Sequence, residues 1–305
     1  KNHYYVSLLE AGNPIFTNEN AYPAMKYPDV GFRMLALYRY WNIIQYYFPY
    51  KYLIGEDWKN ILSEFIPKII LSKNETEYTL TILELIARVN DTHANVWGNK
   101  ILNTYFGLNF PPFNLNFIEN KAVVTYFNDD KLSTETGLQI GDIITRINHK
   151  SVDSIVKKLL KYTPASNYST KLRDIATKTL LRTNDTIINV DYIRDNKKKS
   201  KVIKVNFSNG SKIWKKEYDH LADTCFKLIN PKIAYLSHSA LKGNYMHQIW
   251  NNIKNTSGII LDCRYPPHYA PLDSITKYLF PKKKVYAKST IGNIQTPGLF
   301  TFKDN

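Results

Sequence analysis

The N-terminal part of the chain carries the hydrophobic periodicity of helices, because its apolar residues recur at three- and four-residue intervals. Asp29 has the short polar side chain preferred at a helix N-cap, and Pro49 stops the first helix. Pro67 is expected to kink the second helix, and Asn74 and Glu77 have capping-box spacing at the start of the third. We therefore predict helices over residues 30–48, 56–71 and 74–91, after an extended or turn-rich segment over residues 1–28.

After Gly98 the period changes from that of helices to the alternation of strands. The segment GLQIGDIITRINHK, residues 137–150, places two glycines around a short turn, then an apolar strand, then a tight Asn-His-Lys turn. This order predicts a compact β-unit. Around it the pattern predicts strands over residues 113–117 and 122–127, helices over 151–162 and 169–181, and a hairpin joining 188–192 to 203–207.

The last third of the chain alternates short apolar strands with helical segments. The order β-α-β-α-β is typical of a parallel sheet covered by helices on both faces. Ligands of such sheets bind beyond the carboxyl ends of the strands, so we expect a functional edge at Ser237, Ser239 and residues 262–268. We expect His238 at the surface or the rim of that edge. The predicted strands cover residues 232–236, 257–262 and 285–288, and the predicted helices cover 244–253 and 272–279.

Composition narrows the class of protein. A hydrophobic fraction of 44% is sufficient for real cores, and no apolar run is long enough to span a membrane. The formal charge of +15 comes mostly from scattered lysines without a nucleic-acid motif, so we expect attraction to acidic surfaces or substrates and no nucleic-acid partner. Cys225 and Cys263 cannot build a disulfide framework or a zinc site by themselves, and Cys263 is expected to be a buried thiol. Without metal-ligand spacings, we expect no metal and no organic cofactor.

The first predicted helix is dense in aromatic residues between Phe32 and Phe48. Such a stripe is most often a core packed against neighbouring helices, and we favour that interpretation. The alternative is a carrier of apolar small molecules that bind along the stripe.

The stretch LELIARVNDTHANVW, residues 83–97, is the strongest candidate for chemistry. An apolar helix face runs directly into Asn90, Asp91, Thr92 and His93. Imidazole has an unperturbed pKa near neutrality, so a histidine at a rigid helix end can take and return a proton. The alternative is that Asn90 and Asp91 only cap the helix and His93 donates a hydrogen bond.

The pattern G-L-x-x-G-D-x-I-x-x-I-N at residues 137–148 resembles a PDZ domain of the kind found in bacterial proteases. With a helical domain before it and an α/β domain after it, the chain resembles the C-terminal-processing and tricorn-core serine peptidases, family number forty-one, in its Bacteroidetes-type form. The resemblance implies an α+β multidomain fold that ends in the start of a parallel α/β domain of the ClpP/crotonase-like kind. The implied domains are a helical domain (29–98), a PDZ-like peptide-binding domain with a helical insertion (99–210) and part of the peptidase domain (211–305).

The resemblance also implies roles for individual residues. His93 matches the general base, with Thr92 as the neighbouring hydroxyl that helps to hold the imidazole. Asp262 and Arg264 match an Asp-x-Arg strand end that opens the loop lining the oxyanion hole. In many members a glycine N–H faces the oxyanion where this chain has His268, whose backbone becomes the expected donor. A PDZ domain holds a peptide carboxylate in a backbone nest, which here implies Gly137, Leu138 and Gly141.

The nucleophilic serine and its acidic partner are expected, by resemblance, beyond residue 305, so we expect these 305 residues to be inactive alone. The implied activity is cleavage of unfolded or C-terminal peptide segments, in an extracytoplasmic location, with a peptide or unfolded protein as partner. The sequence does not indicate the oligomeric state. A non-catalytic peptide-binding protein on the same scaffold is the alternative.

Overall fold

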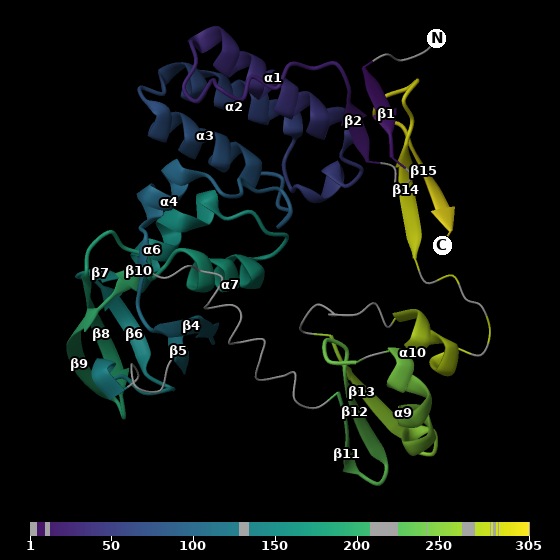
Figure 1. Cartoon of the computed structure of the whole chain (residues 1–305). Coiled ribbons are helices and arrows are strands. Elements are labelled where there is room, and N and C mark those ends of the chain that lie inside the picture. Colours follow the sequence, from purple (N-terminus) through teal and green to yellow (C-terminus); the bar gives the residue numbers. More distant parts are fainter. Residues whose placement is uncertain are drawn as a thin grey trace. The chain divides into compact units, whose positions relative to one another are not determined.

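A computed structural model of the chain describes residues 5–9, 13–127, 134–207, 225–241, 243–263, 272–280, 282, 285 and 287–304. The chain forms two compact units, one of Lys1–Phe207 with Lys288–Asn305 and the other of Ser208–Ala287. Helices and several separate sheets occur together, so the fold is of the mixed α+β kind that the sequence predicts (Figure 1). The finer division into domains at residues 28, 98 and 210 stays a prediction.

Side-chain caps set the ends of the helices in the first unit. Asp29 and Asn74 accept hydrogen bonds from backbone N–H groups of the first helical turn, as expected for N-caps. Asp57 caps the second helix in the same way. The helix therefore begins at Trp58, two residues later than predicted. The helices are α1 (Val30–Tyr47), α2 (Trp58–Leu71), α3 (Glu75–Ala87) and α4 (Lys100–Phe106), with a 3-10 turn at Lys51–Leu53.

The aromatic residues of α1 contribute to a core, as predicted. The indole N–H of Trp41 donates to the carbonyl of Trp58 at 2.8 Å, and that of Trp58 donates to the carbonyl of Trp41 at 3.0 Å. Both rings therefore satisfy their polar atom inside the α1–α2 contact, which buried tryptophan requires. Leu37 and Phe65 are fully buried in the same cluster.

The N-terminal segment also contains strands that its sequence pattern does not predict. Strands β1 (Val6–Leu8) and β2 (Pro14–Phe16) form a short antiparallel hairpin. Three-residue strands are too short for their alternation to be recognised in the sequence. Helix α4 is likewise missing from the sequence-based prediction, which expects strands after Gly98.

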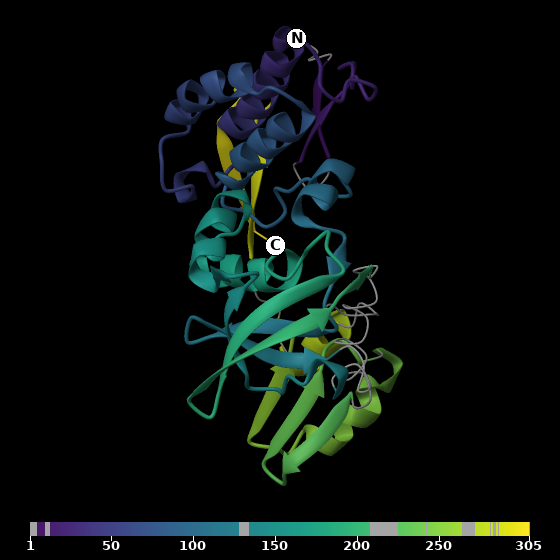
Figure 2. The same cartoon turned by 90° about the vertical axis from the view of Figure 1, so that its left-hand side faces the viewer.

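The first unit also contains an antiparallel sheet with two helices on it (Figures 1 and 2). The strand order is β4-β5-β6-β8-β9, with β7 attached to β6. Ile188, Val190 and Tyr192 of β8 are buried, so the predicted hairpin alternation is confirmed. The strands are β4 (Phe113–Ile118), β5 (Lys121–Phe127), β6 (Ile143–Ile147), β7 (Lys150–Ser151), β8 (Ile187–Arg194) and β9 (Lys197–Lys204).

Helices α6 (Val152–Leu159) and α7 (Tyr168–Lys178) cover this sheet. Val156 of α6 and Ile175 of α7 lie in one buried cluster with residues of β4, β6 and β8. A 3-10 turn at Leu160–Tyr162 follows α6. The short strands β3 (Asn109–Phe110) and β10 (Asn206–Phe207) pair with each other.

The second unit contains a parallel strand pair, as predicted. Strands β12 (Ile233–Ser237) and β13 (Gly258–Asp262) are parallel, and β11 (Phe226–Asn230) pairs antiparallel with β12. Helix α9 (Met246–Ile253), preceded by a 3-10 turn at Gly243–Tyr245, connects β12 to β13. Helix α10 (Leu272–Leu279) follows β13.

The predicted third parallel strand over residues 285–288 is wrong. Strand β14 (Lys288–Gly292) instead pairs antiparallel with β15 (Phe300–Asp304) in a separate hairpin that belongs to the first unit. The side chain of Asn293 accepts hydrogen bonds from two backbone N–H groups in the connecting turn, and this local closure competes with a distant sheet edge. The hydroxyls of Tyr50 and Thr290 lie 3.3 Å apart between the helices and the hairpin. No helix in the described ranges is long and apolar enough to cross a bilayer.

Candidate active site

Asn90, three residues after the end of α3, fixes the turn that carries His93. Asn90 has a left-handed backbone conformation with a φ of +56°, which asparagine tolerates better than most residues. Its side-chain amide donates to the carbonyl of Ile54 at 2.9 Å and accepts a hydrogen bond from Nζ of Lys171 at 3.0 Å. The path of the chain into the His93 turn is therefore tied both to the helical part and to α7.

Asp91 is the side chain that contacts His93. One of its carboxylate oxygens accepts a hydrogen bond from the backbone N–H of His93 at 2.8 Å and lies 3.1 Å from Nδ1 of the ring. Because Asp91 engages Nδ1, Nε2 is the nitrogen available for proton exchange. The His93 side chain is 96% exposed, so a reacting group can reach it. The hydrogen bonds to His93 come from Asp91, and the supporting role of Thr92 stays a prediction.

A buried phenol lies close enough to this turn for the Asp91 carboxylate to affect it. The hydroxyl of Tyr40 is buried and has no hydrogen-bond partner among the residues that the structure describes. Burial, and to a lesser degree the Asp91 carboxylate, raises the pKa of Tyr40 well above its ordinary value.

The predicted peptide-binding glycine turn is occupied by internal hydrogen bonds. The backbone N–H of Gly137 donates to the carbonyl of Thr134, that of Leu138 to the hydroxyl of Thr136, and that of Gly141 to the carbonyl of Val124. These three N–H groups are therefore engaged within the molecule. Their role in binding a peptide carboxylate stays a prediction.

The same turn is held by a buried ion pair. Asp142 is 2% exposed and accepts hydrogen bonds from the Arg194 guanidinium at 2.7 and 2.6 Å. A buried charge is stable only when it is paired and hydrogen-bonded, and this bidentate pair meets that condition. Arg194 also donates to the carbonyl of Gly137 at 2.9 Å, so the aspartate of the motif has a structural function.

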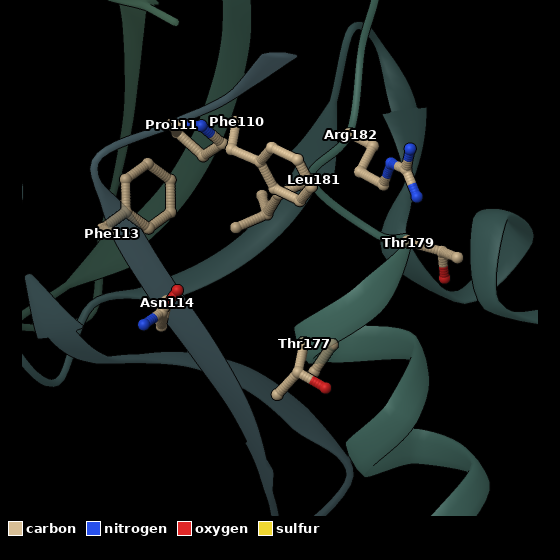
Figure 3. A pocket seen from close by; sticks show the side chains of 9 residues that line it. Phe110, Pro111, Phe113, Asn114, Thr177, Thr179, Leu181 and Arg182 are labelled. Atoms are coloured by element: carbon tan, nitrogen blue, oxygen red, sulfur yellow. The ribbon is translucent and has the colours of Figure 1, made fainter. Parts of the chain in front are cut away.

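A hollow that the sequence does not predict lies between β4 and the end of α7 (Figure 3). It has room for about one water molecule. Threonine hydroxyls lie on its α7 side, and Arg182 lies at its margin. Arg182 donates to the carbonyl of Gly107 at 2.6 Å and to the carbonyl and side-chain oxygens of Asn103. The residues that line the hollow are Phe110, Pro111, Phe113, Asn114, Ala176, Thr177, Thr179, Leu181 and Arg182.

The charge of Arg182 is not neutralised by any carboxylate in the described part of the chain, since its hydrogen-bond acceptors there are all neutral. Burial lowers its pKa, which reflects the cost of desolvating the cation. Strand β4 is an edge strand of its sheet. An edge strand can accept an added peptide strand, and a guanidinium without a carboxylate partner can attract a peptide carboxylate.

The strand ends of the second unit partly differ from expectation. Asp262 ends β13, where its carboxylate accepts a hydrogen bond from the Tyr235 hydroxyl at 2.7 Å. His238 is only 6% exposed, so its predicted position at a surface or rim is wrong. Its backbone N–H donates to the carbonyl of Asp262 at 2.9 Å, which holds the chain inward after β12. Arg264 and His268 lie outside the described residues.

The hydroxyls of Ser237 and Ser239 are 3.1 Å apart and buried at the same edge. Cys263 is exposed, so the predicted buried thiol is wrong, because the apolar run ends at Asp262. Within the described ranges, no group of His, Cys, Asp and Glu side chains has the arrangement of a metal site.

The chain thus joins a helical part, an antiparallel sheet with two covering helices and a parallel strand pair with its helical connection, which defines a multidomain α+β fold. No protein-family model matches the chain. No curated protein sequence matches it either.

Solved structures do match. A structure of mature CPAF complexed with lactacystin has 12% sequence identity and a TM-score of 0.52, over 76% of this chain and 55% of the CPAF chain. A photosystem II D1 C-terminal processing protease has 10% identity and a TM-score of 0.30, over 74% of this chain and 57% of that chain. A PDZ domain protein from Parabacteroides distasonis ATCC 8503 has 10% identity and a TM-score of 0.25, over 65% of this chain and 48% of that chain. The chain is similar in fold to CPAF and spans about half the length of that protein.

Proposed function

We propose that the chain belongs to a serine-type peptidase that cleaves unfolded or C-terminal peptide segments. His93 takes the proton of a serine hydroxyl as that oxygen attacks the scissile carbonyl. The amide bond then breaks, the leaving amine receives the proton from His93, and water hydrolyses the acyl-enzyme. By resemblance the serine lies beyond residue 305, and the backbone N–H of His268 is the proposed oxyanion donor.

The observation that supports this function best is the geometry of the His93 turn. A general base needs one ring nitrogen held and the other accessible, and Asp91 holds Nδ1 while the side chain is 96% exposed. Asn90 fixes the approach of the chain to this turn through both polar atoms of its side chain. A helix cap alone does not require the exposed imidazole.

The test is labelling of the full-length protein with a fluorophosphonate probe, followed by mapping of the modified residue. We expect one serine to be labelled in the wild type. In His93→Ala we expect the labelling rate to fall by about 10²-fold or more, because the serine loses its base. The thermal unfolding temperature should stay nearly unchanged, because His93 is exposed.

The matched control is His247→Ala, which removes an exposed histidine from α9 and should leave labelling intact. Labelling that survives in His93→Ala would show that His93 has a structural role and is not the general base. A folded wild-type protein that is not labelled would favour the second candidate function.

That second candidate is a non-catalytic peptide-binding protein, and the edge strand β4 with Arg182 beside it favours this function. An extended peptide can add to the β4 edge, with its carboxylate near Arg182. This placement differs from the glycine turn at residues 137–141, whose N–H groups are already engaged.

Isothermal titration with peptides that have an apolar C-terminal residue tests this placement. We expect Thr177→Phe, which places a bulky ring at the hollow, to obstruct the peptide and to weaken binding about tenfold, or by about 1.4 kcal/mol. Ser169→Phe, at the exposed start of the same helix, is the control. Amidation of the peptide should also weaken binding, and equal affinity for both forms would exclude carboxylate recognition.

A further inference from the structure

Helix α7 contacts both ends of the loop that carries His93. Lys171 donates a hydrogen bond to the side chain of Asn90, and Nζ of Lys178 lies 5.8 Å from the centre of the Trp97 ring. The two lysines are seven residues apart, two turns or about 10.5 Å along the helix, so they project from the same side. One helix face therefore brackets residues 90–97.

The contact of Lys171 is unusual for a lysine. The side chain is half-buried, and in the described part of the chain its acceptor is the neutral amide of Asn90. Burial, followed by the charge of nearby Arg88, lowers the pKa of Lys171. A lysine held near another cation, without a carboxylate partner, stabilises the fold little. The placement of Lys171 is therefore better explained by the position in which it holds Asn90.

The second contact is aimed by a buried carboxylate. Nζ of Lys178 donates to Asp174 at 2.7 Å, and Asp174 is 4% exposed on the same helix. The ammonium group is thereby fixed against the Trp97 ring, whose face attracts cations. Trp97 is itself 68% exposed, so core packing does not explain its position.

We propose that α7 braces the His93 loop, with Lys171 and Lys178 as positioning residues for the reaction of His93. This inference rests on the proposed peptidase function. Lys171 holds the loop three residues before His93, and Lys178 holds it four residues after. Neither lysine reacts with the substrate. Their effect is to keep Nε2 in line with the serine, because small displacements of a catalytic group slow the chemical step strongly.

The test uses Lys171→Met, Lys178→Met and the double variant in the full-length protein. Methionine keeps much of the apolar stem and removes the charged donor. We expect kcat to fall about tenfold in each single variant and further in the double variant, with KM unchanged. Lys171→Arg should recover most of the loss, because arginine still donates to Asn90. Lys157→Met, at an exposed lysine of α6, is the matched control.

A second measurement does not depend on activity. In nuclear magnetic resonance spectra the His93 ring and Trp97 indole signals should shift in both methionine variants and stay in place in Lys157→Met. If the wild type cleaves peptides and the double variant keeps its kcat, the positioning role of Lys171 and Lys178 is wrong, and the peptidase proposal is unaffected. If the wild type shows no activity, the peptidase proposal fails, and unshifted His93 and Trp97 signals would overturn the brace as well.

Discussion

Gly107, the C-cap residue of α4, lies directly against the backbone of Thr183. Its φ is +113°, and a Cβ atom placed on it would lie 2.4 Å from the backbone nitrogen of Thr183. The neighbouring backbones exchange hydrogen bonds, with Asn109 N–H donating to Thr183 at 2.8 Å and Thr183 N–H to Asn109 at 3.2 Å. Glycine is required here for both conformation and space.

We expect Gly107→Ala to lower the free energy of unfolding by about 3 kcal/mol or more, because left-handed strain and a backbone clash add. Gly55→Ala is the control: Gly55 has a φ of +85°, but no atom lies within 4 Å of the point that a Cβ would occupy. It should cost only about 1 kcal/mol. Urea unfolding followed by circular dichroism measures both. Equal losses would show that the close approach to Thr183 is unimportant.

At the scale of elements, α2 and α3 are joined by a network of charges. Glu64 of α2 accepts hydrogen bonds from Lys68 at 2.7 Å and from Arg88, just after α3, at 2.9 Å. Lys68 also contacts Glu84 of α3 at 2.7 Å, and Arg88 is paired with Glu56. Burial raises the pKa of Glu64, but the two cations outweigh it, so the pKa lies below its ordinary value.

A carboxyl group with a lowered pKa in the folded state contributes stability above its unfolded pKa, and this stability is lost as the pH falls through the folded pKa. We therefore expect Glu64→Gln to destabilise the protein at pH 7 by less than about 1 kcal/mol, because the pair is partly exposed. The difference should shrink as the pH falls below about 4.5 and vanish once the pH lies below the lowered pKa of the folded state. Thermal unfolding across this range measures it, and a constant difference would exclude the ion pair as its cause.

The elements that the sequence predicts well are those whose signals are local. Asp29 and Asn74 cap their helices, and the alternation of β8 matches its buried residues, because caps and alternation act within a few residues. The missed hairpin of β1 and β2 has strands of three residues. For β14 the difference concerns the partner rather than the type of element, since the pattern of a strand does not reveal which neighbour it pairs with.

At the scale of the whole molecule, the sequence predicts the part of the candidate site that is local in the chain and misses the part that depends on packing. The His93 turn is visible in the sequence because its residues are adjacent, and the structure adds the contact of Asp91 with Nδ1 of His93. The hollow is not visible, because Phe110 and Arg182 are far apart in the sequence and meet where the backbones of Asn109 and Thr183 pair. The burial of His238 likewise depends on how its strand end packs.

Strand β9 has a consequence for how copies of the protein meet in solution. It is an edge strand, and every residue but Ile203 is exposed. Its lysines would oppose one another if two copies paired edge to edge, and like charges across strands are destabilising. Paired strands are about 4.8 Å apart. This distance is shorter than the Debye length of about 8 Å at physiological salt, so the lysines repel one another there, but it exceeds the Debye length of roughly 3 Å at about 1 M salt. Resistance to aggregation along this edge is therefore set by ionic strength. The lysines are Lys197, Lys198, Lys199, Lys201 and Lys204.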